Sequence, residues 1–241
     1  MNESGHAKNI ANFASYISIV TTFGAAYKPP VPSITVAAMQ TNLTNFETAK
    51  NSVTPKSSAE TIALNERQAA FDPLSPLVTR IVNAAAVSVN DQLFSNDLRT
   101  IARKLQGRRA SAKTDDDPAT PGIDESKQGI SASQMSFDNR IANFEELINL
   151  LTTSGSYTPN ESELQITALE TMLADLKAKN MAAVNAVNQA RAARIARDEL
   201  LYNDTNGIIA LANLVKKYVK SVFGANSPQY KQLTALKFKK P

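Results

Sequence analysis

The sequence predicts an all-α protein built from two tandem copies of a four- to five-helix unit, which we expect to pack as a pseudo-twofold helical bundle. Three observations favour this fold. Apolar residues recur at helical spacing, the 241 residues include only 8 Gly, and a stretch near the N-terminus returns in the second half of the chain. A hydrophobic fraction of 43% is enough for a packed core.

The internal repeat is the clearest of these observations. The stretch IANFASYISIVTTFG, which begins at Ile10, shares eight of fifteen residues with IANFEELINLLTTSG, which begins at Ile141. Later residues also correspond, namely Tyr27, Ile34, Met39 and Arg67 with Tyr157, Leu164, Leu169 and Arg197. Because identity and apolar phase persist together, the pattern indicates a duplication.

The repeat divides the chain into three segments. We expect copy one at 5–106, copy two at 134–241, and between them a polar linker, GRRASAKTDDDPATPGIDESKQGISAS, at 107–133. A segment this polar cannot bury enough apolar surface to order itself. The two copies could share one core or form separate domains, and a shared core is the more economical arrangement.

The first helix of each copy is marked by its apolar face and its ends. In copy two, Ser136 or Asp138 would cap the start and Gly155 would follow the end. In copy one, Gly24 follows the same pattern. The apolar face is predicted from residues three and four apart: Ile10, Phe13, Ile17 and Val20, and Phe137, Ile141, Phe144, Ile148 and Leu151.

The remaining helices follow in order. A second helix begins near Ser33 in copy one and near Glu161 in copy two. Thr54-Pro55 predicts a turn before a third helix at 57–71, whereas copy two has no such breaker, so its second and third helices run together. A fourth helix is expected at 77–87 and 208–223, and a last short one at 91–105 and 228–238.

Catalytic and metal chemistry find little support. The chain has no Cys, and its one histidine, His6, is expected to be exposed near the N-terminus. The acidic run at 115–117 lacks the spacing of a calcium-binding loop, and no phosphate-binding or nucleophile motif occurs. We therefore predict a protein that is not an enzyme, with no catalytic residue, metal site, cofactor or small-molecule substrate.

Basic residues gather toward the C-terminus. Residues 205–241 contain seven Lys and no acidic residue. Lys216, Lys217 and Lys220 fall at helical spacing and form a polar stripe opposite an apolar face that includes Val222. With the tail residues they make a candidate polyanion-binding set: Lys216, Lys217, Lys220, Lys237, Lys239 and Lys240. The alternative interpretation is the ordinary solvated face of an amphipathic helix. A smaller basic group comprises Arg99, Arg103, Lys104, Arg108 and Arg109.

Two further segments carry a resemblance to a known family. SASQMSFDNRIANF (131–144) and VKKYVKSVFGANSPQYKQL (215–233) resemble a family of uncharacterised proteins of Bacteroidota type. The resemblance extends over both copies and the linker. It implies a duplicated all-helical protein of bacterial origin, and it supplies no activity, ligand or site.

Three functions remain open. The first is a non-enzymatic structural or scaffold protein that associates with itself or binds another protein. The second is nucleic-acid binding without sequence preference through the Lys-rich C-terminal helix, and the third is peripheral association with anionic membrane surfaces. No apolar run is long enough to span a bilayer, and a cytoplasmic location is the default expectation, with an unconventional export route left open.

Overall fold

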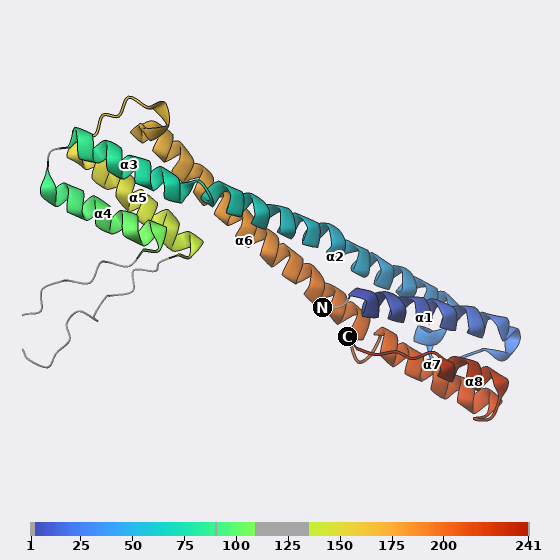
Figure 1. Cartoon of the computed structure of the whole chain (residues 1–241). Coiled ribbons are helices and arrows are strands. Elements are labelled where there is room, and N and C mark those ends of the chain that lie inside the picture. The colour runs from blue at the N-terminus through green and yellow to red at the C-terminus, as the bar shows by residue number, and fades with distance from the viewer. Residues whose placement is uncertain (1–2, 90, 109–134, 241) are drawn as a thin grey trace, which may run out of the picture. The chain divides into compact units, whose positions relative to one another are not determined.

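A computed structural model describes residues 3–89, 91–108 and 135–240 (Figure 1), and within these ranges the chain is helical, with no β-strand. The all-α prediction is confirmed. Apart from its first two residues, the expected linker at 107–133 lies outside the described ranges. The α-helices in chain order are α1 (Glu3–Thr22), α2 (Val36–Phe71), α3 (Leu74–Ser88), α4 (Gln92–Gln106), α5 (Phe137–Ser154), α6 (Ile166–Tyr202), α7 (Ile208–Phe223) and α8 (Pro228–Ala235).

Three helix ends follow the general rules of helix capping. The Ser136 side chain accepts a hydrogen bond from the Asn139 N–H at the start of α5, and Gly155 at its end has a φ of 63°. At α4, the Asp91 carboxylate accepts from two backbone N–H groups of the first turn. These ends depend on residues close in sequence, so the sequence alone located them well.

The predicted turn at Thr54-Pro55 is wrong, because α2 is one continuous helix with Pro55 inside it. Proline supplies no N–H to the carbonyl four residues back, on Asn51. Asn51 is exposed, so water can satisfy that carbonyl and the helix continues. The matching prediction for copy two is confirmed, since α6 is uninterrupted over 166–202.

The described chain forms two compact units. Unit 1 comprises residues 1–61 and 186–241, and unit 2 comprises residues 62–185. Both boundaries fall inside long helices, one within α2 and one within α6. Unit 1 therefore holds α1, α7 and α8, and unit 2 holds α3, α4 and α5, as the grouping in Figure 1 shows. Each unit draws residues from both of the segments 5–106 and 134–241 that the sequence delimits.

Each unit has its own apolar core. In unit 1 the core joins α1 to α7, and among its fully covered side chains are Phe13, Val20, Leu211 and Val215. In unit 2 the core joins α5 to α3 and α4, through residues that include Phe144, Leu151, Ile81 and Leu105. A buried side chain of this size stabilises the fold by about 1.5–3 kcal/mol relative to its exposed state. These two clusters therefore hold the helices of each unit together.

The same tyrosine contact closes a loop in each unit. The Tyr27 hydroxyl donates to the Ile34 carbonyl at 2.7 Å, and the Tyr157 hydroxyl donates to the Leu164 carbonyl at 3.0 Å. Both tyrosines are buried, and burial raises the pKa of each phenol above its ordinary value. Each contact fixes the short 3₁₀ turn that precedes a long helix, η2 (Pro32–Ile34) before α2 and η4 (Ser162–Leu164) before α6.

Candidate polyanion-binding surface

All six lysines of the predicted polyanion-binding set lie in unit 1. Three are on α7, and the other three follow α8 in the C-terminal tail. The apolar face of α7 is buried through residues three and four apart, namely Ile208, Leu211, Ala212, Val215 and Val219. This packing leaves Lys217 and Lys220 exposed to solvent. The predicted apolar face is narrower than expected, since Val222 is 45% exposed.

Lys216 differs from its two neighbours on α7 because it is half-buried. Its Nζ lies 5.9 Å from the centroid of the Tyr16 ring and 5.8 Å from that of the Phe238 ring. The two rings are arranged edge to face, with their centroids 5.1 Å apart. Burial, with a smaller contribution from the charge of Lys237, lowers the pKa of Lys216. The Lys216 ammonium group therefore makes cation–π contacts with aromatic rings of its own unit.

The tail that carries the other three lysines is bonded to α1. The Asn9 side-chain amide donates to the Lys239 carbonyl at 2.6 Å, and the Asn9 Oδ1 accepts from the Lys239 N–H at 3.2 Å. Further along α1, Asn12 donates to the Lys237 carbonyl at 2.7 Å. These bonds hold the tail backbone and leave the side chains of Lys237, Lys239 and Lys240 exposed.

Charge is unevenly divided between the two compact units. Residues 1–61 and 186–241 carry 14 Lys and Arg against 6 Asp and Glu, a net charge of +8. Residues 62–185 carry 12 basic against 16 acidic residues, a net charge of −4. Across the part of the chain that the structure describes, none of the six lysines of the set forms an ion pair. Unit 1 therefore offers a positive surface that is not neutralised locally.

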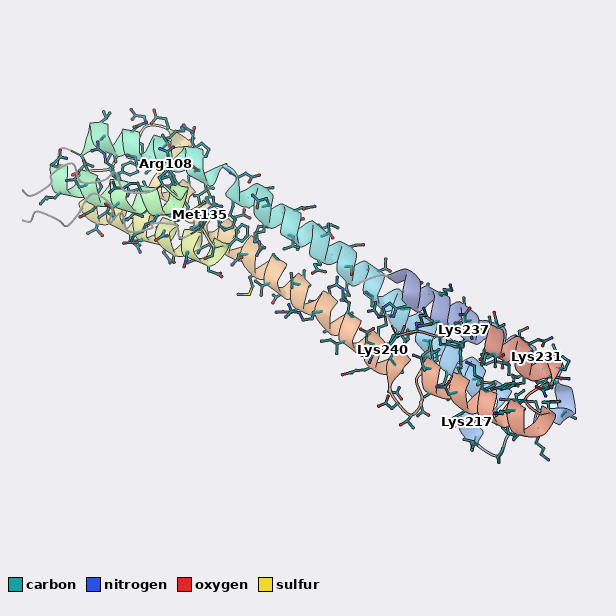
Figure 2. All side chains as sticks on the ribbon, turned by 60° about the horizontal axis from the view of Figure 1, so that its bottom comes forward. Arg108, Met135, Lys217, Lys231, Lys237 and Lys240 are labelled. Carbon is teal, nitrogen blue, oxygen red and sulfur yellow. The ribbon has the colours of Figure 1, made fainter. Side chains whose placement is uncertain are left out.

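The basic groups are spread over unit 1. In Figure 2 Lys217 projects from α7, while Lys237 and Lys240 lie apart from it and from each other along the tail. Such a distribution does not form a pocket for one small anion. It is typical of surfaces that meet an extended chain of negative charges.

The prediction for His6 is wrong, because His6 is only 1% exposed. Its Nδ1 lies 2.8 Å from the Tyr202 hydroxyl, and its Nε2 lies 4.0 Å from a carboxylate oxygen of Asp198. Asn9 also donates to the Tyr202 hydroxyl, at 3.1 Å. The expectation failed because α1 begins at residue 3, so His6 lies inside a helix that packs against the end of α6.

Arginines lie beside His6 in unit 1 and at the matching positions of the repeat in unit 2. Arg197 is fully buried and donates to Asp198 at 2.9 Å. In unit 2 the Arg67 guanidinium lies 4.0 Å from the centroid of the Phe137 ring, and Arg140 donates to the Phe71 carbonyl at 3.0 Å. The alignment of Arg67 with Arg197 was the available signal for these contacts. Arg140 and Arg197 are buried and Arg67 is half-buried, so these side chains pack within their units.

The described residues lack two features. They contain no group of three or more His, Cys, Asp or Glu side chains placed to hold a metal ion. Among the described helices, none combines the length and apolar character needed to cross a bilayer. No model of a protein family, no curated protein and no solved structure matches this chain, so its function has to be inferred from its own residues.

Proposed function

We propose that this chain is a non-enzymatic interaction protein that uses a rigid duplicated helical scaffold to associate with itself or to bind another protein. The observation that carries the proposal is the exposure of three large apolar side chains on the long helices of unit 2. Ile62 on α2 is 58% exposed, and Met181 and Val184 on α6 are 61% and 43% exposed. Exposed apolar groups of this kind are common at protein interfaces.

The helices that carry these side chains are held together by polar contacts. In unit 2 Lys179 pairs with Glu66 at 2.9 Å, and Arg67 donates to the Asn180 side chain at 3.2 Å. Met181 and Val184 are three residues apart and therefore lie on the same side of α6. A partner that covers them would remove apolar area from water without unfolding either helix.

The duplication is part of the same proposal. In support of it, the order of a helix, a loop closed by tyrosine, a 3₁₀ turn and a long helix occurs twice along the chain. Each compact unit would then combine the first half of one copy with the second half of the other. Such an exchange would link the two copies through both units.

Light scattering after size exclusion tests self-association, and recovery of partners from the native source tests binding to another protein. We expect Met181→Glu with Ile62→Glu to abolish the complex, because two charges would be buried at the contact. Thr171→Glu, at another exposed position of α6 in unit 2, is the matched control and should retain it. A monomeric protein that recovers no partner would refute the proposal.

Nucleic-acid binding without sequence preference is a second candidate, favoured by the net charge of +8 on unit 1. Fluorescence anisotropy of labelled single- and double-stranded oligonucleotides should show affinity that falls by orders of magnitude between about 50 and 200 mM salt. The double variant Lys217→Glu with Lys220→Glu should bind more weakly than the unaltered chain at the same salt concentration, because both side chains are exposed. Lys216→Glu is less informative, since Lys216 also contacts the Tyr16 ring.

An affinity that does not change with salt concentration, or no binding at low salt, would contradict this second candidate. Flotation with anionic but not neutral vesicles would instead favour the membrane-surface alternative. A cytoplasmic location and a bacterial origin stay predictions of the sequence.

A further inference from the structure

We propose a second, separate binding site in unit 2: a pocket between α3 and α4 that takes the phosphate group of a small phosphorylated molecule. The pocket has a volume of about 240 Å³. Its lining includes three arginines, Arg99, Arg103 and Arg108, together with Asn83 and the apolar residues Val82 and Ala102. The proposal does not depend on either function suggested above.

Among the described residues, the three arginines have no anionic partner. The pocket lining contains no acidic residue, and within the described ranges none of Arg99, Arg103 and Arg108 forms an ion pair. Arg99 and Arg103 are four residues apart on α4, where two like charges repel. An arrangement that concentrates three positive charges without compensation is suited to a bound anion.

The end of α4 fixes the position of the third arginine. Gly107 has a φ of 65°, and its N–H bonds back to the carbonyls of Arg103 and Lys104. The next residue, Arg108, donates its N–H to the Arg103 carbonyl at 3.0 Å. This reversal of the chain is the usual glycine-based helix ending. It returns Arg108 to the same pocket as Arg103, whereas a continuing helix would carry it away.

A neutral side chain at the end of α4 links the two helices that line the pocket. Gln106 donates from its amide nitrogen to the Ser75 carbonyl at 3.1 Å and to the Thr79 hydroxyl at 2.8 Å. Both donors of this amide are thereby used, and Gln106 ties the end of α4 to α3. Arg103 uses one donor on the Thr100 hydroxyl at 3.0 Å, and within the described ranges the other guanidinium donors of the lining form no side-chain hydrogen bond.

The chemistry of the lining selects the ligand class. One arginine is enough to pair with a carboxylate, but three positive charges match the double negative charge and three oxygens of a phosphate monoester. Val82 and Ala102 offer apolar contact to the organic part of such a molecule. The shared recognition element is the phosphate group, which could come from a monoester or from free phosphate.

The test is a calorimetric or NMR titration of the full-length protein at about 150 mM salt, with phenyl phosphate, inorganic phosphate and benzoate as probes. We expect saturable binding of one phenyl phosphate per chain and weaker binding of benzoate. Each of the variants Arg99→Gln, Arg103→Gln and Arg108→Gln should bind phenyl phosphate about tenfold or more weakly than the unaltered chain. Equal affinity for phenyl phosphate and inorganic phosphate would assign the site to free phosphate, whereas tighter binding of phenyl phosphate would assign it to a monoester.

Two controls separate this site from the rest of the basic surface. Lys104→Gln is the matched variant on α4, because the Lys104 Nζ pairs with Glu146 at 3.6 Å and does not line the pocket. Lys217→Gln with Lys220→Gln tests unit 1 in the same titration. Both controls should bind phenyl phosphate as the unaltered chain does. The proposal is overturned if no saturable binding occurs, if benzoate binds as tightly, or if the three arginine variants bind normally.

Discussion

Replacing Asn9 by alanine should release the C-terminal tail and weaken unit 1. The Asn9 side chain is 3% exposed and makes three hydrogen bonds, two with the backbone of Lys239 and one with the Tyr202 hydroxyl. A typical intramolecular hydrogen bond contributes about 1 kcal/mol net. Because Lys239 is exposed, water can replace its lost bonds, and Tyr202 keeps its contact with His6. We therefore expect Asn9→Ala to cost about 2–3 kcal/mol.

The cost can be measured globally and locally. For a chain of this size a loss of 2–3 kcal/mol lowers Tm by about 5–10 °C, which circular dichroism detects. Limited trypsin digestion should also cleave the variant faster after Lys237 and Lys239, since a released tail can enter a protease active site. Asn12→Ala is the matched control, because it removes one bond to the same tail and should cost at most about 1 kcal/mol. If Asn9→Ala is no less stable than Asn12→Ala and its tail stays protected, the tail is not held by this contact.

Three other predictions concern the helices and the buried tyrosines. Tyr27→Phe and Tyr157→Phe should each cost about 1 kcal/mol in urea denaturation, and unequal losses would mean that the two loop contacts differ in strength. Burial raises the pKa of Tyr157 to about 12, above an unfolded value of about 10, so its neutral phenol favours the folded state. That contribution is complete below about pH 10 and is lost as pH rises toward about 12, which absorbance at alkaline pH and denaturation at each pH should show together. Pro55→Ala should raise the free energy of unfolding in urea by about 1 kcal/mol, because the N–H restored to the Asn51 carbonyl outweighs the lost rigidity of the unfolded chain.

Much of the local structure was accessible from the sequence. The cap at Ser136, the helix end at Gly155 and the uninterrupted α6 were expected. The turn at Pro55 was not correct, because an exposed helix can tolerate a missing hydrogen bond that water replaces. The helix propensity of a single residue predicts a helix end poorly when packing on either side of that residue stabilises the helix.

The candidate lysine surface was only partly accessible. The sequence located the basic residues on one helix and a tail, and helical spacing placed Lys217 and Lys220 on the polar side of that helix. It did not predict the half-buried Lys216 or the exposed Val222. It could not show that Lys216 lies beside the rings of Tyr16 and Phe238, or that Asn9 holds the tail. The contacts of Lys216 with Tyr16 and of Asn9 with Lys239 join residues 200 or more positions apart in the chain, and no local pattern encodes them.

The sequence by itself determined the helical class, most helix boundaries, the similarity of the two halves and the concentration of lysine toward the C-terminus. Those features depend on residues within a few positions of one another, through helical period and capping. Only the tertiary structure decided that α1 packs with α7 and α8 while α5 packs with α3 and α4. Because the two halves have similar apolar faces, either half could supply the partner helices. The choice depends on the total packing of the chain, which placed His6 in a core and three arginines around one pocket.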